Sequence, residues 1–206
     1  MDEKFIPILE GAARVFMQYG VKSITMDDIA RELKVSKKTL YLYVSDKNDL
    51  VHKVMDGKCF HEECLLQNIE CACENAIEEL IAVSRHVSEE LHQVHPSVIF
   101  DLQKYYPEAW KRFEEHKYQT VVGHIRRNLD RGIKEGLYRN NLDADIISRL
   151  FAAKIDIMFD PAVFPFGKYS FEHIHWEVTR YHIRGIASEK GLQYLNEIVN
   201  KKQTRL

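Results

Sequence analysis

A group of cations and hydroxyl side chains is concentrated between residues 31 and 47. Five lysine or arginine residues stand against two acids there, so the segment carries a local charge of +3. Cations paired with phosphates release condensed counterions, and hydroxyls donate hydrogen bonds to phosphate oxygens. These residue types therefore favour binding to a phosphate backbone. The cations are Arg31, Lys34, Lys37, Lys38 and Lys47, and the acids are Glu32 and Asp46.

Two short helices joined by a tight turn are predicted around this group. Thr25 is a good N-cap for the first helix, and Ser36 is a good N-cap for a second one that runs to about Val44. In the turn between them, Val35 supplies an apolar plug, and Ala30 keeps the crossing of the helices small. This arrangement is typical of a helix-turn-helix unit, whose second helix can lie in the major groove of DNA.

Residues 24–50 also carry a recognisable pattern. It consists of Ile29-Ala30, Val35-Ser36-Lys37, Thr39-Leu40-Tyr41-x-Tyr43, Lys47 and Leu50. The pattern resembles the DNA-binding region of TetR-family transcriptional regulators over roughly residues 5–55, and residues 135–151 are similar to the stretch before the dimerisation helices of such proteins. The resemblance implies an all-α protein of about nine to ten helices. A three-helix helix-turn-helix domain, residues 1–47, would precede a larger helical bundle, residues 48–206, that binds a ligand and dimerises.

The resemblance also assigns roles to individual residues. The phosphate contacts would come from Thr25, Thr39, Tyr43 and Lys47, whereas Lys37, Lys38 and Tyr41 would lie at the groove. Three positions depart from the family pattern. Lys34 and Lys38 stand where small residues are usual, and Val44 stands where phenylalanine is frequent. The two lysines could contact either bases or phosphates, so the operator sequence stays open.

Helical spacing of apolar residues continues along the rest of the chain. The first helix should begin no earlier than about Glu3, since Pro7 fits only a first turn, and should end at Gly20. Ser45 is expected to cap the fourth helix. The helices expected beyond it span about 46–67, 72–94, 97–105, 108–135, 144–160, 171–189 and 192–201.

The helix at 144–160 is apolar around most of its circumference. Its polar stripe consists of Asp145, Arg149, Asp156 and Asp160. A helix that packs on one core needs only one apolar face. A wider apolar face implies that the helix is buried on two sides. We therefore expect a homodimer formed through helices of about 144–160 and 171–189.

Large aromatic side chains in the second part of the chain could line a cavity for a ligand. Those selected are Phe100, Tyr105, Trp110, Phe113, Phe159 and Trp176. A helical bundle also needs large side chains in its core, so cavity and core remain equal alternatives for the group.

Composition limits the other classes of function. The 206 residues carry a net charge of −2 and hold no apolar run long enough for a membrane span. The acidic first residues do not fit a secretory signal, so a cytoplasmic protein with reduced thiols is expected. Motifs for nucleophilic catalysis and for phosphate loops are missing. Neither an enzyme nor a cofactor is predicted, and no metal site is assigned.

A helical-bundle metal or redox protein is the alternative. Its candidate ligands are two E-x-x-H pairs, Glu89 with His92 and Glu172 with His175, and the cysteines Cys59, Cys64, Cys71 and Cys73. Chance alone predicts about one such pair at this composition, and zinc sites usually show two spaced cysteine pairs. The sequence favours a DNA-binding regulator instead. We expect a repressor that binds a double-stranded DNA operator and leaves it when a small-molecule effector binds, with no role at a membrane.

Overall fold

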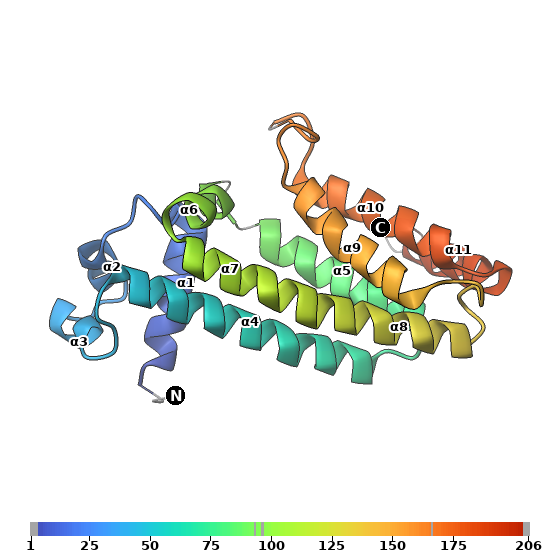
Figure 1. The fold of residues 1–206 in the computed structure, drawn as a ribbon, viewed down its shortest axis with the longest axis horizontal. Coiled ribbons are helices and arrows are strands. Elements are labelled where there is room, and N and C mark those ends of the chain that lie inside the picture. Colours follow the sequence, from blue (N-terminus) through green and yellow to red (C-terminus); the bar gives the residue numbers. More distant parts are fainter. Residues whose placement is uncertain (1–3, 93, 96, 166, 204–206) are drawn as a thin grey trace. The chain divides into compact units, whose positions relative to one another are not determined.

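A computed structural model of the chain describes residues 4–92, 94–95, 97–165 and 167–203 (Figure 1). It confirms the all-α prediction: these residues form helices joined by turns, and their β-type pairing is an isolated bridge between Tyr138 and Ala187. Within the same residues, no helix is both long enough and apolar enough to cross a membrane.

The chain packs as two compact units, and α4, Lys47–Ala72, contributes to both. The first unit lies within residues 1–64 and 93–116. Its other helices are α1 (Ile6–Tyr19), α2 (Met26–Glu32), α3 (Lys37–Tyr41), α6 (Ser97–Tyr105) and α7 (Pro107–His116). Its core includes the fully buried side chains of Phe16, Ile29, Leu40 and Leu50, one from each of the first four helices.

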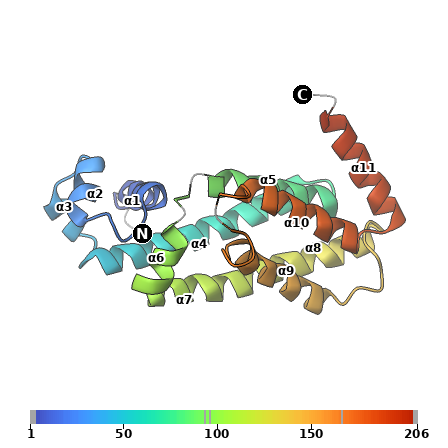
Figure 2. The same cartoon turned by 90° about the horizontal axis from the view of Figure 1, so that it is seen from above.

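The second unit lies within residues 65–92 and 117–206. It holds α5 (Ala76–His92), the π-helix η1 (Lys117–Val121), α8 (Val122–Lys134), α9 (Ala144–Met158), α10 (Phe171–Ile186) and α11 (Glu189–Gln203). Helix α10 packs on α5, and α9 packs on α8 (Figure 2). Ile77, Ile125, Leu129 and Ile183 form the centre of its core.

The caps of α1 and α2 follow the sequence prediction. Pro7 lies in the first turn of α1, and Gly20 ends that helix with φ of +84° while its N–H donates to the carbonyl of Phe16. Thr25 and Asp28 form a complete capping box at the start of α2. Each cap satisfies backbone groups that the helix end leaves free, so these boundaries are set locally.

The predicted cap of α4 was wrong by one residue. Asp46, rather than Ser45, occupies the N-cap position, and its carboxylate accepts the N–H of Asp49. The Asp49 carboxylate in turn accepts the N–H of Ser45. The N-cap acid Asp46 and the first-turn acid Asp49 thus each accept a backbone N–H with a charged oxygen, whereas a serine hydroxyl would accept without the charge.

Other predicted boundaries differ from the structure as well. Helix α3 ends at Tyr41 rather than at about Val44, and α4 continues to Ala72 rather than to about residue 67. Helix α5 begins at Ala76 instead of residue 72, because Asn75 caps it by accepting the N–H groups of Ile77 and Glu78. The helix predicted at 108–135 is interrupted by η1, which places Lys117 in the interior, where it donates to the Asp156 carboxylate. A π-helical turn changes the face that each residue presents, and apolar spacing does not reveal it.

The packing boundary also differs from the predicted division at residue 47. Asp101 of α6 is buried, and its carboxylate accepts the N–H groups of Val21 (3.0 Å) and Lys22 (2.9 Å) in the turn between α1 and α2. Helix α6 therefore packs with the first three helices, although it lies far from them in sequence. The assignment of separate functions to residues 1–47 and 48–206 stays a prediction.

Candidate DNA-binding surface

The turn between α2 and α3 has the tight geometry that the sequence indicated. The N–H of Val35 donates to the carbonyl of Ala30 at 3.0 Å, and Lys34 adopts φ of +55°. A residue with a Cβ is strained in this left-handed region, which glycine occupies freely. Lys34 therefore holds a conformation that glycine would adopt without strain.

Helix α3 presents cations and an aromatic ring to solvent. Lys37, Lys38 and Tyr41 are all exposed, as expected for side chains that enter a groove. Lys37 is already engaged: its Nζ lies 2.9 Å from Oδ1 of Asp27 in α2, and this hydrogen-bonded carboxylate raises the pKa of the lysine. Lys38 and Tyr41 therefore form the more available part of this face.

The two threonines predicted to contact phosphates also take part in helix capping, Thr25 as the cap of α2 and Thr39 as a partner of the cap of α3. Thr25 accepts the N–H of Asp28 at 3.2 Å and donates its hydroxyl to the Asp28 carboxylate at 2.6 Å, which lowers the pKa of that acid. Thr39 shares a hydroxyl contact of 2.7 Å with Ser36, the cap of α3. Each threonine therefore has a structural role in addition to the proposed contact with a phosphate.

Tyr43 and Lys47 are held more firmly than their sequence positions suggest. The Tyr43 ring stacks on Phe5 with centroids 4.9 Å apart, and its carbonyl accepts from Lys53 Nζ at 2.8 Å. Lys47 is partly buried and donates to the carbonyl of Lys22 at 3.2 Å. Burial lowers the pKa of its ammonium group. Lys47 thus holds the backbone before α2, and Lys53 holds the backbone after α3.

The predicted ligand-contacting aromatics are distributed over both units. Phe100 and Tyr105 are exposed on α6, and the rings of Trp110 and Phe113 lie 5.4 Å apart on α7 against the core of the first unit. In the second unit, Phe159 stacks on Phe171 at 4.8 Å. Trp176 is exposed on α10. Their role in ligand binding stays a prediction.

A surface groove of about 370 Å³ lies between α9 and α10. Its walls include Leu150 and Lys154 of α9, and Tyr181 and His182 of α10. None of the predicted aromatic residues lines it. His182 is buried beside the ring of Phe151, and burial lowers the pKa of its imidazole to about 4.

Among the residues whose side chains the structure describes, those of the metal or redox alternative form no cluster of three or more ligands. Glu172 is exposed, whereas His175 is buried and its Nδ1 lies 2.9 Å from the hydroxyl of Ser88. Glu89 is exposed on α5, and the side chain of His92 lies outside the described residues. The four cysteines are free thiols, and burial raises the pKa of Cys59 to about 12, so this thiol stays protonated at neutral pH.

Sequence reasoning missed the residues that support this surface from a distance. Asp101 holds the turn before α2, and Lys53 holds the carbonyl of Tyr43. Asp101 is separated from its partners by about eighty positions. An apolar periodicity contains no information on such a contact, so one sequence offered no way to find it.

Comparison with known proteins agrees with this geometry. The family model described as "Bacterial regulatory proteins, tetR family" matches residues 8–54, which contain α2, α3 and most of α1. The HTH-type transcriptional repressor KstR2 of Mycobacterium tuberculosis is 24% identical over 149 residues, covering 69% of this chain and 72% of that protein. YvaF of Bacillus subtilis, an HTH-type transcriptional regulator, is 25% identical over 165 residues, covering 78% and 82%.

The likeness in fold extends beyond the matched segment. The structure of FadR from Bacillus subtilis in complex with stearoyl-CoA superposes with a TM-score of 0.66 at 20% identity, covering 88% of this chain and 99% of that one. The sequence relatives are transcriptional regulators, and the metal or redox alternative is not favoured. The capped helix-turn-helix at residues 8–54 thus matches the tetR family of bacterial regulatory proteins, and the chain as a whole shares the fold of FadR.

Proposed function

We propose that this protein is a dimeric repressor that binds a palindromic DNA operator through α3 and leaves it when a small-molecule effector binds to the second unit. The exposed face of α3 carries the proposal. There, Lys38 and Tyr41 project to solvent from a helix that caps and buried contacts hold on both sides. Such a helix can enter a major groove, with neighbouring cations on the phosphates.

The contacts that we propose fall into two groups. Lys37, Lys38 and Tyr41 would reach the base edges or the rim of the groove. Thr25, Thr39, Tyr43 and Lys47 would contact phosphates through hydroxyl and ammonium groups at the ends of α2, α3 and α4. Phosphate contacts set the register on the duplex, whereas base contacts distinguish sequences.

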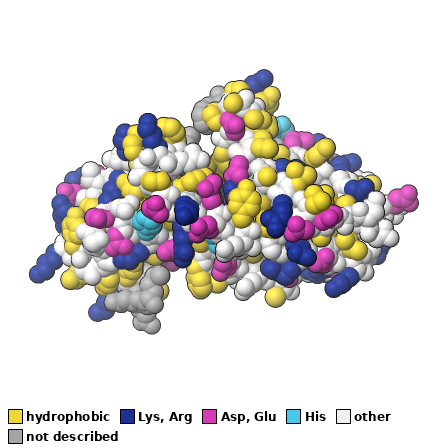
Figure 3. Space-filling view, in the orientation of Figure 1, with side chains coloured by type: hydrophobic (Ala, Val, Ile, Leu, Met, Phe, Trp, Pro, Cys, Tyr) yellow, Lys and Arg dark blue, Asp and Glu magenta, His cyan; other side chains and the backbone are white. Residues whose placement is uncertain are grey.

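Dimerisation through α9 and α10 is supported by an exposed apolar stripe. Ile146, Leu150 and Ile157 of α9 are exposed, and Tyr181 of α10 is 75% exposed. Hydrophobic side chains are visible at the surface over α9 in Figure 3. Part of the polar stripe of α9 is used within its own unit, since Asp145 lies near Arg126 and Asp156 accepts from Lys117. The apolar stripe is therefore available to a second copy, related by a two-fold axis.

The dimer is needed because one recognition helix reads few base pairs. Two-fold partners would place two α3 helices on successive turns of the duplex, about 34–36 Å apart. An effector that binds more tightly to a dimer whose two α3 helices no longer match the operator spacing would release DNA. The coupling free energy between effector binding and DNA binding is typically about 1–3 kcal/mol. We place the protein in the cytoplasm, where the operator and the effector are both present.

The effector that we propose is an apolar or amphipathic small molecule. FadR is in complex with stearoyl-CoA, and KstR2 is called a ketosteroid transcriptional regulator, so long-chain acyl-CoA and steroid compounds are the first probes. Phe100, Tyr105, Trp110, Phe113, Phe159 and Trp176 are the residues to substitute for binding.

The test is footprinting on the DNA beside the protein's own coding region. We expect protection of an inverted repeat, lost when Lys38 and Tyr41 are both changed to alanine and kept when the exposed Glu10 is changed. Adding the correct effector should abolish protection. A protein that protects no repeat under low-salt conditions would contradict the operator proposal. Protection that survives every probe would leave the DNA-binding role standing and refute release by these two classes.

A further inference from the structure

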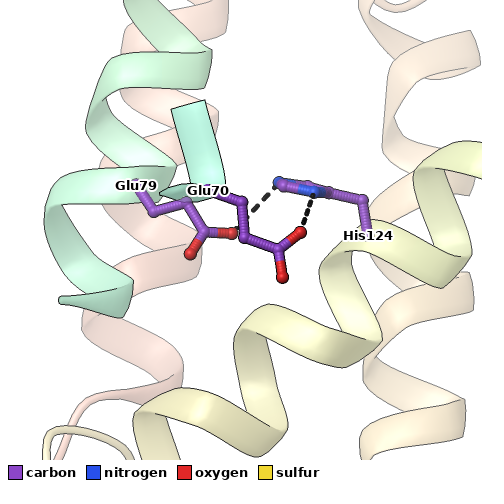
Figure 4. Close-up of side chains that lie close together, drawn as sticks. All are labelled: Glu70, Glu79 and His124. Carbon is purple, nitrogen blue, oxygen red and sulfur yellow. Dashed lines mark ion pairs between the residues drawn. The ribbon is translucent and has the colours of Figure 1, made fainter. Parts of the chain in front are cut away.

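Two carboxylates and an imidazole meet in the second unit. Glu70 comes from the end of α4, Glu79 from α5 and His124 from α8, and Figure 4 shows both glutamates directed toward the histidine ring. One ligand atom from each residue lies within 4.8 Å of the others. The ring Nε2 lies 3.3 Å from Glu79 Oε1, and Nδ1 lies 3.9 Å from Glu70 Oε2.

The Glu79 carboxylate is unusual in its burial. Glu79 is 1% exposed, and its Oε1 accepts no hydrogen bond, although that atom faces the cluster. Burial raises the pKa of this carboxyl group. A buried carboxylate oxygen that lacks a donor costs free energy unless a cation or a proton satisfies it. The interior of the cluster is therefore suited to a cation.

Arg131 orients the cluster without occupying its centre. Its guanidinium donates to Glu79 Oε2 at 3.0 Å and also to the backbone carbonyls of Glu70 and Cys73. One arginine thus fixes the outer oxygen of Glu79 and the chain on either side of the turn after α4. Hydrogen bonds of this kind commonly hold metal ligands in place.

The distances suit a small divalent ion. Zinc binds imidazole nitrogen and carboxylate oxygen at about 2.0–2.2 Å, so neighbouring ligand atoms in a tetrahedron lie about 3.4 Å apart. The separation between His124 Nε2 and Glu79 Oε1 is 3.3 Å. Glu70 Oε2 lies 3.9 Å from the other ring nitrogen, Nδ1, so this carboxylate must turn toward Nε2 to bind the same ion as Glu79. In doing so it would exchange its 3.4 Å contact with the exposed Arg127 for the ion.

The local charge also favours a cation. Three carboxylates, those of Glu70, Glu79 and Glu135, lie within ion-pair distance of two guanidinium groups, those of Arg127 and Arg131. With His124 neutral, the group carries a formal charge of −1. A divalent ion would reverse that charge to +1, at the point where three helices meet.

We propose that Glu70, Glu79 and His124 form a binding site for one divalent transition-metal ion, with Zn²⁺ as the reference probe. The ion would join the end of α4 to α5 and α8 and leave a fourth position for water. It would bind whether or not the chain binds DNA. Imidazole favours zinc and its neighbours over Mg²⁺, which prefers all-oxygen sites.

The experiment is calorimetric titration of the full-length, EDTA-dialysed protein with Zn²⁺, Mn²⁺ and Mg²⁺, with metal content measured after gel filtration. We expect one Zn²⁺ per chain and at least tenfold weaker binding of Mg²⁺. Glu79→Gln and His124→Gln should each weaken Zn²⁺ binding at least tenfold. Glu89→Gln, an exposed glutamate of the same helix α5, is the matched control and should bind as the original protein does.

Two further variants keep the proposal open to refutation. Glu70→Gln alters a partly exposed ligand, so it tests the site even if the buried substitutions impair folding. Cys71→Ser with Cys73→Ser should leave binding intact, and Co²⁺ should show no thiolate charge-transfer band. The proposal is overturned if the original protein binds no Zn²⁺, if the glutamine variants bind normally, or if the serine variant loses the ion.

Discussion

Replacing Asp101 with alanine should destabilise the first unit by removing the acceptor that holds the turn between α1 and α2. The carboxylate is 6% exposed and accepts the N–H groups of Val21 at 3.0 Å and Lys22 at 2.9 Å through the same oxygen, Oδ2. The N–H of Val21 is buried, so alanine leaves it without a partner.

The expected cost follows from these two hydrogen bonds. Bonds to a charged group contribute about 1.5–3 kcal/mol each, so the pair sets a range of about 3–6 kcal/mol. The Lys22 bond is only partly buried, and water can replace its acceptor. We therefore expect a loss near the lower limit, about 3 kcal/mol. Asp101→Asn keeps an oxygen that can accept both N–H groups and should cost about 1–2 kcal/mol.

Urea unfolding at one fixed protein concentration measures both variants. Glu10→Ala, an exposed change on α1, is the control and should stay within about 0.5 kcal/mol of the original protein. If Asp101→Ala costs no more than this control, the carboxylate does not hold the turn, and the reasoning from the two hydrogen bonds is refuted.

Three further outcomes are expected. Lys47→Ala should weaken binding to all DNA sequences alike and reduce the slope of log K against log salt by about two per dimer, one for each lost phosphate contact; a changed sequence preference would place Lys47 at the bases instead. Ile157→Glu should give a monomer or an aggregate by light scattering and abolish operator binding, because it places two carboxylates in an apolar interface; a variant that remains a dimer would refute the interface. Burial lowers the pKa of His182 from 6.5 to about 4 in the folded protein, so protonation of this imidazole favours unfolding. Its contribution to the free energy of unfolding, about 3 kcal/mol, is fully present above pH 6.5 and is lost as pH falls toward 4. His182→Leu should remove this part of the pH dependence, and an unchanged difference in unfolding free energy between pH 7 and pH 4.5 would contradict it.

Local features determined the part of the fold that the sequence predicted well. Thr25, Ser36 and Asp143 cap their helices through bonds to N–H groups two or three residues away, so each boundary depends on residues adjacent in the chain. Apolar spacing likewise identified the apolar residues of α9. It did not distinguish those that are buried from those that are exposed. The helix-turn-helix was recognisable for the same reason, since its caps, plug and turn are all local.

Contacts between distant segments required the tertiary structure. The interior position of Lys117 depends on a π-helical turn and on Asp156, thirty-nine residues away. The cluster of Glu70, Glu79 and His124 assembles only because the ends of three helices meet. The spacing of apolar residues does not predict such contacts between helices. The free energy that brings the helices together comes from the packing of whole helices rather than from interactions between residues adjacent in sequence. The sequence alone determined which helices form and which of them resembles a DNA reader, and the packing of those helices decided which side chains face one another.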